Sequence, residues 1–408
     1  MNLDPGHAAI ARRKPVPRGI ANDGPAILSY GFRPFFLLAG VFAVVSMGVW
    51  IGALTLGWEI GGDYGALNWH AHEMLFGYTS AVLAGFILTA VPNWTGRFPV
   101  SGIPLLGLVL VWSFGRVVMA VPALVGVPVS ALLDACFLPL MAIVVGTEIV
   151  AGKNWKNLKI LAGLIALSLA NVAFHLFVAF SGSAIELSPF AVGIYVMLIA
   201  IIGGRIVPSF TRNWLAKAKS PKLPAPFGPF DVFALTWLLL ALILWATLRE
   251  GPVTAVAALV AALLHAVRLS RWRGWRTVDE PLLLVLHIAY AFVPLGMVAV
   301  GLAAMGWVAS ASALHVLTVG AIGNMTLAMM TRVSLGHTGR VQTASLPTAL
   351  AYLALALSAV VRPFAEVVPS QYHLLLSLSG LCWLLAFGLF ILEYGPILVS
   401  QTVNARQA

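Results

Sequence analysis

Twelve long apolar stretches run through the sequence, and each could cross the hydrocarbon core of a bilayer as an α-helix, which takes about 20 residues. Charged residues make up only 9% of the chain, far below the roughly 25% of soluble domains, so they cannot cover a folded surface in water. This composition excludes a cytosolic enzyme, a nucleic-acid-binding protein and a disordered scaffold. We therefore predict an all-α polytopic membrane helix bundle with twelve transmembrane helices. The predicted helices lie at about residues 35–57, 69–91, 103–125, 129–151, 158–182, 189–208, 228–248, 252–272, 281–303, 310–331, 346–367 and 373–399.

Lys and Arg residues are concentrated in every second segment that connects the predicted helices. If the N-terminus is cytoplasmic, nearly all of them fall on the cytoplasmic side, where such residues are enriched. The exceptions are Arg249 and Arg362 in outer segments and Arg116 within an apolar stretch. The formal net charge of +10 therefore indicates topology and no nucleic-acid partner. We predict one transmembrane domain with cytoplasmic termini, divided as a basic tail at 1–30, the twelve-helix domain at 31–400 and a short tail at 401–408.

The chain has only two cysteines, Cys136 and Cys382, and they form no C-x-x-C pair. The sequence therefore lacks the thiolates for an iron–sulfur cluster. It also lacks a C-x-x-C-H motif, so any haem would be bound non-covalently.

Histidines replace charged residues in the apolar part of the chain. Five lie near the predicted outer ends of the helices, namely His70, His72, His175, His315 and His373. His265 and His287 form a second level, each about two turns from the cytoplasmic end of its helix. Ionisable groups within membrane helices are costly and are candidates for function. Imidazoles at one depth, with few carboxylates and no thiolate set, favour haem or copper.

The spacing of His70 and His72 adds a geometric constraint. In a regular α-helix, residues two apart point about 200° away from each other, so these two imidazoles would serve different partners. Glu73 shares a face with His70 and could orient it or act as a ligand itself. The alternative is an interfacial helix start with polar residues among the lipid headgroups. For each membrane histidine, a hydrogen bond between helices is the other explanation.

Arg116 and Asp134 lie at similar depth on neighbouring predicted helices. An ion pair between them is favoured over a role in proton transfer or in binding a haem propionate.

Four stretches resemble the NnrS family of bacterial membrane proteins. They are YGFRPFF at 30–36, WHAHEMLFG at 69–77, LTAVPNWTG at 88–96 and the segment 314–340, which begins LH and ends TRVSLGHTGR. Weaker matches are GRIVPSFTRN at 204–213 and LHIAY at 286–290. Asn324 departs from the pattern, because a small residue or Thr is expected after Gly323.

The resemblance implies an inner-membrane protein that contains haem b and copper and is tied to nitric oxide, nitrosative stress and denitrification. Carried over residue by residue, the candidate ligands are His70, His72, His175, His287 and His315. We expect His70 or His72, with His315, to hold the haem and Glu73 to support it. His175, with His265 and His287 deeper in the membrane, is the candidate group for a second metal. If the protein is an enzyme, it is a haem-dependent oxidoreductase acting on nitric oxide or a related nitrogen species; its electron donor is unknown.

Three inner helix ends repeat a similar Pro/Thr/Arg pattern at 92–97, 208–212 and 331–332. This spacing suggests three pseudo-repeats of four helices, and the architecture is similar to that of haem–copper oxidase core subunits. The likeness is an analogy of fold, since no adjacent His-His pair is present. The alternatives to a haem protein are a multi-pass transporter and a non-catalytic sensor or assembly factor for haem or metal.

Overall fold

The structure is a computed structural model that describes residues 24–403, and within that range it contains helices and turns but no strand. Twelve helical segments in this range are long and apolar enough to cross a membrane, which confirms the predicted fold class. Most of the basic N-terminal tail and residues 404–408 lie outside the described range, so the division into tails and domain stays a prediction.

The spans follow the predicted order along the chain. They are α1 (Phe32–Leu56); α2 (Ala66–His72), η3 (Glu73–Tyr78) and α3 (Thr79–Thr95) together; α4 (Gly102–Ala120); α6 (Val127–Ala135) with α7 (Phe137–Ala151); α8 (Leu158–Ser181); α9 (Ser188–Lys217); α10 (Pro229–Thr247); α11 (Pro252–Ser270); α12 (Pro281–Ala304); α13 (Ser310–His315), η7 (Val316–Gly323) and α14 (Asn324–His337) together; α15 (Leu346–Val361) with α16 (Phe364–Val367); and α17 (Tyr372–Val399).

Proline and glycine set many of the helix boundaries. Pro229, Pro252 and Pro281 occupy the first helical turn, where a missing N–H costs nothing. Gly57 and Gly182 end α1 and α8 in the left-handed conformation that glycine adopts without steric penalty. These residues explain why the helices begin and end close to where the sequence predicted.

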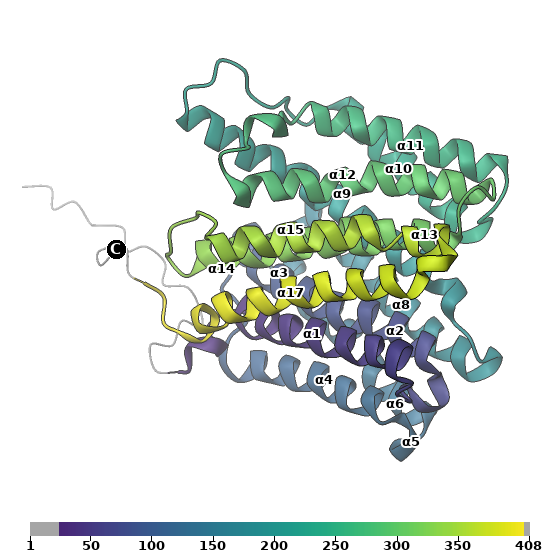
Figure 1. Cartoon of the computed structure of the whole chain (residues 1–408). Helices are drawn as coiled ribbons and strands as arrows, with labels where there is room; N and C mark the ends of the chain where they lie inside the picture. Colours follow the sequence, from purple (N-terminus) through teal and green to yellow (C-terminus); the bar gives the residue numbers. More distant parts are fainter. Residues whose placement is uncertain (1–23, 404–408) are drawn as a thin grey trace, which may run out of the picture.

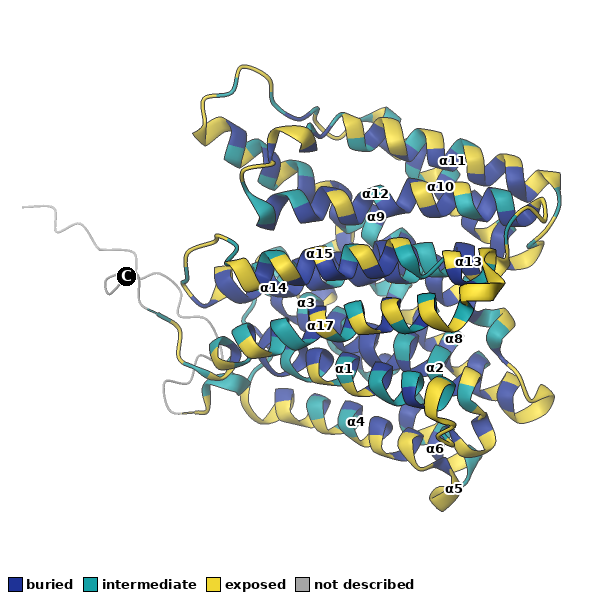
Figure 2. Cartoon of the chain, viewed as in Figure 1, coloured by how far each residue is buried: buried dark blue, intermediate teal, exposed yellow. Residues whose placement is uncertain are grey.

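The helices run roughly parallel, with α9–α12 side by side as one group and α1, α4 and α17 on the opposite side of the bundle (Figure 1). Exposed residues follow the outward faces of the peripheral helices, where lipid would lie (Figure 2). Three spans are the most buried, because 78% of the apolar window of Ala66–Thr95 and 67% of those of Pro281–Ala304 and Ser310–His337 are buried, against 39% for the span of α1. We call Ala66–Thr95 and Ser310–His337 the inner spans. They carry most of the predicted site residues.

Both inner spans change from α- to π-helix directly after a histidine. The π-helix η3 follows His72, and η7 follows His315. Single π-turns inside α-helices are rare and are frequent at functional sites. Sequence periodicity alone did not predict either segment.

Helices α3, α9 and α14, which belong to the second, sixth and tenth spans, border a common apolar cavity of about 80 Å³. These are the three helices that carry the repeated Pro/Thr/Arg pattern. Their convergence agrees with the suggested pseudo-repeats, which stay a prediction.

The predicted topology is testable by cysteine labelling. In a background with Cys136 and Cys382 replaced by Ala, we expect a membrane-impermeant maleimide to label Ser183→Cys in intact spheroplasts. Lys219→Cys should be labelled only after permeabilisation, because the basic segments face the cytoplasm. Both positions are exposed in the structure. The reverse labelling pattern would contradict the orientation.

Candidate haem and metal site

Helix α2 directs its two histidines into different surroundings, as their spacing predicted. His70 lines a large cavity near the helix ends that the sequence predicts to be outer, whereas His72 faces α6 and α8. The site therefore has two parts on opposite sides of one helix, which we call the outer cavity and the His/Asp cluster.

The outer cavity has a volume of about 430 Å³ and is lined mainly by apolar and aromatic side chains. His70 of α2 and His315 of α13 both line it, so the structure brings together the second and tenth spans as expected. Its walls include Trp50, Tyr78 and Trp383. The volume is within the range of roughly 300–1,000 Å³ typical of cofactor sites.

The two cavity histidines keep nitrogen atoms that have no protein partner. His315 Nδ1 donates to the Ala311 carbonyl at 2.7 Å, which leaves Nε2 as the lone-pair nitrogen. The His70 ring stacks on Trp50 with 4.2 Å between ring centroids, and its Nδ1 is buried without a hydrogen bond. Buried polar atoms are nearly always satisfied, so an unpartnered imidazole nitrogen at a cavity needs an explanation.

The His/Asp cluster consists of His72, Asp134 and His175, whose ligand atoms all lie within 4.8 Å of one another. Asp134 Oδ2 is 3.1 Å from His72 Nε2 and 3.0 Å from His175 Nε2. Asn171 completes the group, since its Nδ2 donates to Asp134 Oδ2 at 2.9 Å and its Oδ1 lies 3.0 Å from His72 Nε2. The three members of the cluster and Asn171 are all buried.

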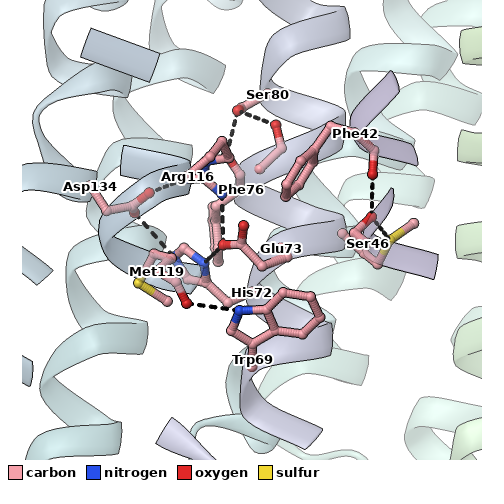
Figure 3. Close-up of polar contacts among 12 residues, drawn as sticks. Phe42, Ser46, Trp69, His72, Glu73, Phe76, Ser80, Arg116, Met119 and Asp134 are labelled. Carbon is pink, nitrogen blue, oxygen red and sulfur yellow. Dashed lines mark hydrogen bonds and ion pairs between the residues drawn. The ribbon is translucent and has the colours of Figure 1, made fainter. Parts of the chain in front are cut away.

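Arg116 joins the cluster to Glu73, and Figure 3 shows this arrangement. Its Nη1 donates to Glu73 Oε1 at 2.7 Å, and its Nη2 donates to Asp134 Oδ1. The predicted ion pair between Arg116 and Asp134 is thus confirmed. Glu73 contacts His72 Nδ1 at 2.8 Å, and it is His72, not His70, that this carboxylate orients.

The charges around the cluster do not balance with neutral imidazoles. Two buried carboxylates, Glu73 and Asp134, face one guanidinium, so the group carries one excess negative charge. Both ring nitrogens of His72 also face oxygen acceptors, and a neutral imidazole can donate only one hydrogen bond. A proton or a metal ion bound at the cluster would resolve both problems.

Tyr64, just before α2, fixes the orientation of His175. Its hydroxyl lies 2.8 Å from His175 Nδ1. Burial raises the pKa of the Tyr64 hydroxyl above its ordinary value, and the negative charge of Glu73 adds to the shift. Tyr64 therefore keeps its proton, and its hydroxyl can either donate to Nδ1 or accept an Nδ1–H, while His175 Nε2 lies 3.0 Å from Asp134 Oδ2. A ligand histidine typically has such a partner on its second nitrogen.

The π-helices are stabilised by side chains that donate to their carbonyl groups. In η3, the Leu75 carbonyl accepts from Tyr195 at 2.8 Å and the Gly77 carbonyl accepts from Trp112 at 3.0 Å. In η7, Asn324 Nδ2 lies 3.1 Å from the carbonyls of both Val319 and Gly320. Asn324, which departs from the family pattern, thus supplies a donor that a small residue would lack.

The structure places His265 and His287 away from both parts of the site. His265 bonds to the Tyr290 hydroxyl and the Ala234 carbonyl, and His287 bonds to Thr211. Among the described residues, no hydrogen bond or ring contact joins His265 to His287. Neither is brought into the cluster with His175, although both stay candidates from the sequence. His373 is exposed and does not line the outer cavity.

Sequence reasoning missed Asn171 and Tyr64, and it assigned Asp134 only to an ion pair. Asn171 and His175 are four residues apart in α8, so they share a helix face, and this spacing could have identified Asn171. Tyr64 precedes its helix in a connecting turn and gives no such signal.

Arg116→Met should lower the stability of the protein strongly. The substitution leaves Glu73 and Asp134 buried without their guanidinium, and breaking a buried ion pair costs about 3–5 kcal/mol. The matched control is Arg97→Gln, whose partly exposed pair with Glu148 should contribute under about 1 kcal/mol. Thermal unfolding in detergent measures both, and equal losses in the two variants would contradict the role given to Arg116.

The chain is similar to known proteins at the level of a family. No curated protein sequence matches the chain. The family model described as NnrS protein matches residues 26–401, a range that includes both parts of the site. This membership supports a nitric-oxide-responsive membrane protein in general terms. The chain belongs to the NnrS family.

Proposed function

We propose that this protein binds haem b non-covalently in the outer cavity and binds or reacts with nitric oxide there. The observation that carries the proposal is that His70 and His315, from two different helices, line one cavity, where His315 Nε2 is left without a protein partner and the His70 ring has no hydrogen bond at Nδ1. The protein would act in the inner membrane of a bacterium, with its termini in the cytoplasm, in nitrosative-stress response or denitrification.

The residues of the cavity fit a haem group. The walls are mainly apolar and include the flat rings of Trp50 and Trp383, and the charged lining residues are Glu186, Arg249, Glu250 and Arg362. An amphipathic macrocycle with a metal centre and carboxylate groups needs this combination of surfaces. Two histidines from different helices supply nitrogen ligands.

When bound, haem would supply an iron centre that can coordinate nitric oxide or transfer electrons. The chain's own residues would control the ligands: the Ala311 carbonyl holds His315 in the tautomer with Nε2 free, and Trp50 fixes the ring plane of His70. Coordination by both histidines suits electron transfer, whereas coordination by one leaves a position for a gas. Nitric oxide is small and apolar, so it can reach a site in the bilayer without a polar channel.

The His/Asp cluster is proposed as the second metal site, with copper as the metal that the family resemblance implies. Two imidazole nitrogens and a carboxylate oxygen are a ligand set that divalent copper accepts. The positive charge of the ion would offset the excess negative charge of Glu73 and Asp134. Tyr64 would hold His175 in place.

The transporter alternative has less support. Transporters typically bind substrate where membrane helices are discontinuous near the bilayer midplane. In the described part of the chain, the inner spans continue through η3 and η7 without a break, and the site histidines His70, His72 and His315 lie near the predicted outer ends.

Purified protein should show a haem absorption band that shifts on reduction with dithionite. We expect His70→Ala and His315→Ala to lose most of the bound haem, because each would remove a nitrogen ligand proposed for the haem iron. His373→Ala is the matched control, since this histidine is exposed and outside the cavity, and it should retain haem. Addition of nitric oxide to the reduced protein then shows whether the iron has an open position. A wild-type protein without haem would overturn the proposal.

Metal analysis of the same preparations tests the His/Asp cluster. His175→Ala should lose copper and keep the haem band, because the two parts of the site lie on opposite sides of α2. His265→Ala and His287→Ala should keep both. Loss of copper from His287→Ala, with His175→Ala unaffected, would instead support the deeper histidines as the metal site.

A further inference from the structure

Two arginines stand apart from the general distribution of positive charge. Lys and Arg residues concentrate in segments predicted to face the cytoplasm, and in the predicted outer segments only Arg249 and Arg362 occur. Positive charge on the outer side opposes the usual topology signal. The position of these two arginines therefore needs an explanation from the residues around them.

Both exceptional arginines line the outer cavity. Arg249 follows the end of α10, and Arg362 follows the last residue of α15, so two separate helices bring them to the same cavity as His70 and His315. Their shared position is not a consequence of proximity in sequence.

The two guanidinium groups are held at the cavity by ion pairs. Arg362 Nη1 donates to Glu366 Oε1 at 2.7 Å, and its side chain is only 13% exposed. Arg249 Nη1 donates to Glu186 Oε2 at 3.0 Å, and its Nη2 donates to the Glu186 carbonyl at 2.9 Å. Each guanidinium has five N–H donors, so these pairs leave further donors for a ligand.

We propose that Arg249 and Arg362 bind the two carboxylate groups of the ligand in the outer cavity, which are the propionates if that ligand is haem. This inference rests on the proposed function and adds the residues that orient the ligand. Arginine binds carboxylates with charge-assisted hydrogen bonds that fix direction as well as position. The carboxylates would then point to the outer side and the iron would lie toward His70 and His315.

The acidic residues at the cavity do not prevent this arrangement. Glu186 and Glu250 both line the cavity and are exposed, Glu186 to 71%, so solvent screens their charges. Glu366 also accepts from Ser312 at 3.1 Å, and this bond holds it beside Arg362 and away from the set of residues that line the cavity. The competing explanation is that Arg362 only stabilises the end of α15, because cations are favourable at helix C-termini.

Binding of haem and of its dimethyl ester separates these explanations. The ester has the same macrocycle and iron but no free carboxylate, so wild-type apoprotein should bind it about tenfold or more weakly than haem. Arg362→Gln and Arg249→Gln should each lose about tenfold in haem affinity and little in ester affinity. Arg362→Lys should restore part of the haem affinity, and Arg276→Gln, in a cytoplasmic loop, should change neither.

The outcomes distinguish this inference from the function on which it rests. If the arginine variants weaken haem and ester equally, or weaken neither, the arginines do not bind the carboxylates and the inference is wrong. If wild-type protein binds neither compound, the haem function itself fails. Helix content by circular dichroism and elution as a single species show that each variant is folded before its affinity is measured.

Discussion

The packing of the helices around the His/Asp cluster depends on the two ion pairs of the Arg116 guanidinium. The guanidinium binds Glu73 of η3 and Asp134 of α6, and so joins three separate spans through charges buried in an apolar bundle. A buried charge without a partner costs several kcal/mol, and in lipid the alternatives to pairing are few. Gly77 allows this approach, because a Cβ at that position would collide with Arg116 Nη1. These contacts fix the rotation of α2 about its own axis.

That rotation determines what the two histidines of α2 can do. Once Glu73 and His72 are held against α6 and α8, His70 must face the opposite side, where the outer cavity lies. One helix turn therefore supplies both parts of the site. The π-helix that follows would lack regular backbone partners for some carbonyls, and Tyr195 and Trp112 satisfy two of them. The unusual backbone is thus stabilised by residues outside the site itself.

The sequence predicts the spans well because bilayer thickness and hydropathy constrain them one at a time. It also predicts that His70 and His72 have different partners, since this follows from helix geometry alone. The partners themselves depend on contacts between distant helices. Glu73 was expected near His70 from its spacing of three residues. Its ion pair with Arg116 of another helix instead places the Glu73 carboxylate beside His72. Asn171 and Tyr64 enter the site only through tertiary packing.

The two parts of the site make opposite electrostatic demands, and this explains why they can coexist on one helix. In the outer cavity, His70 and His315 have no carboxylate partner among the described residues, so both imidazoles are stable in the neutral form that binds a metal. Across α2, two carboxylates share one arginine, and an added cation would offset the second negative charge. Neutral imidazole is the one ligand type that both environments accept without a further countercharge. Asp134 is the one charged member of the His/Asp cluster and is paired with Arg116, and histidine, which can bind a metal without carrying a charge, supplies the other candidate ligands in both parts of the site.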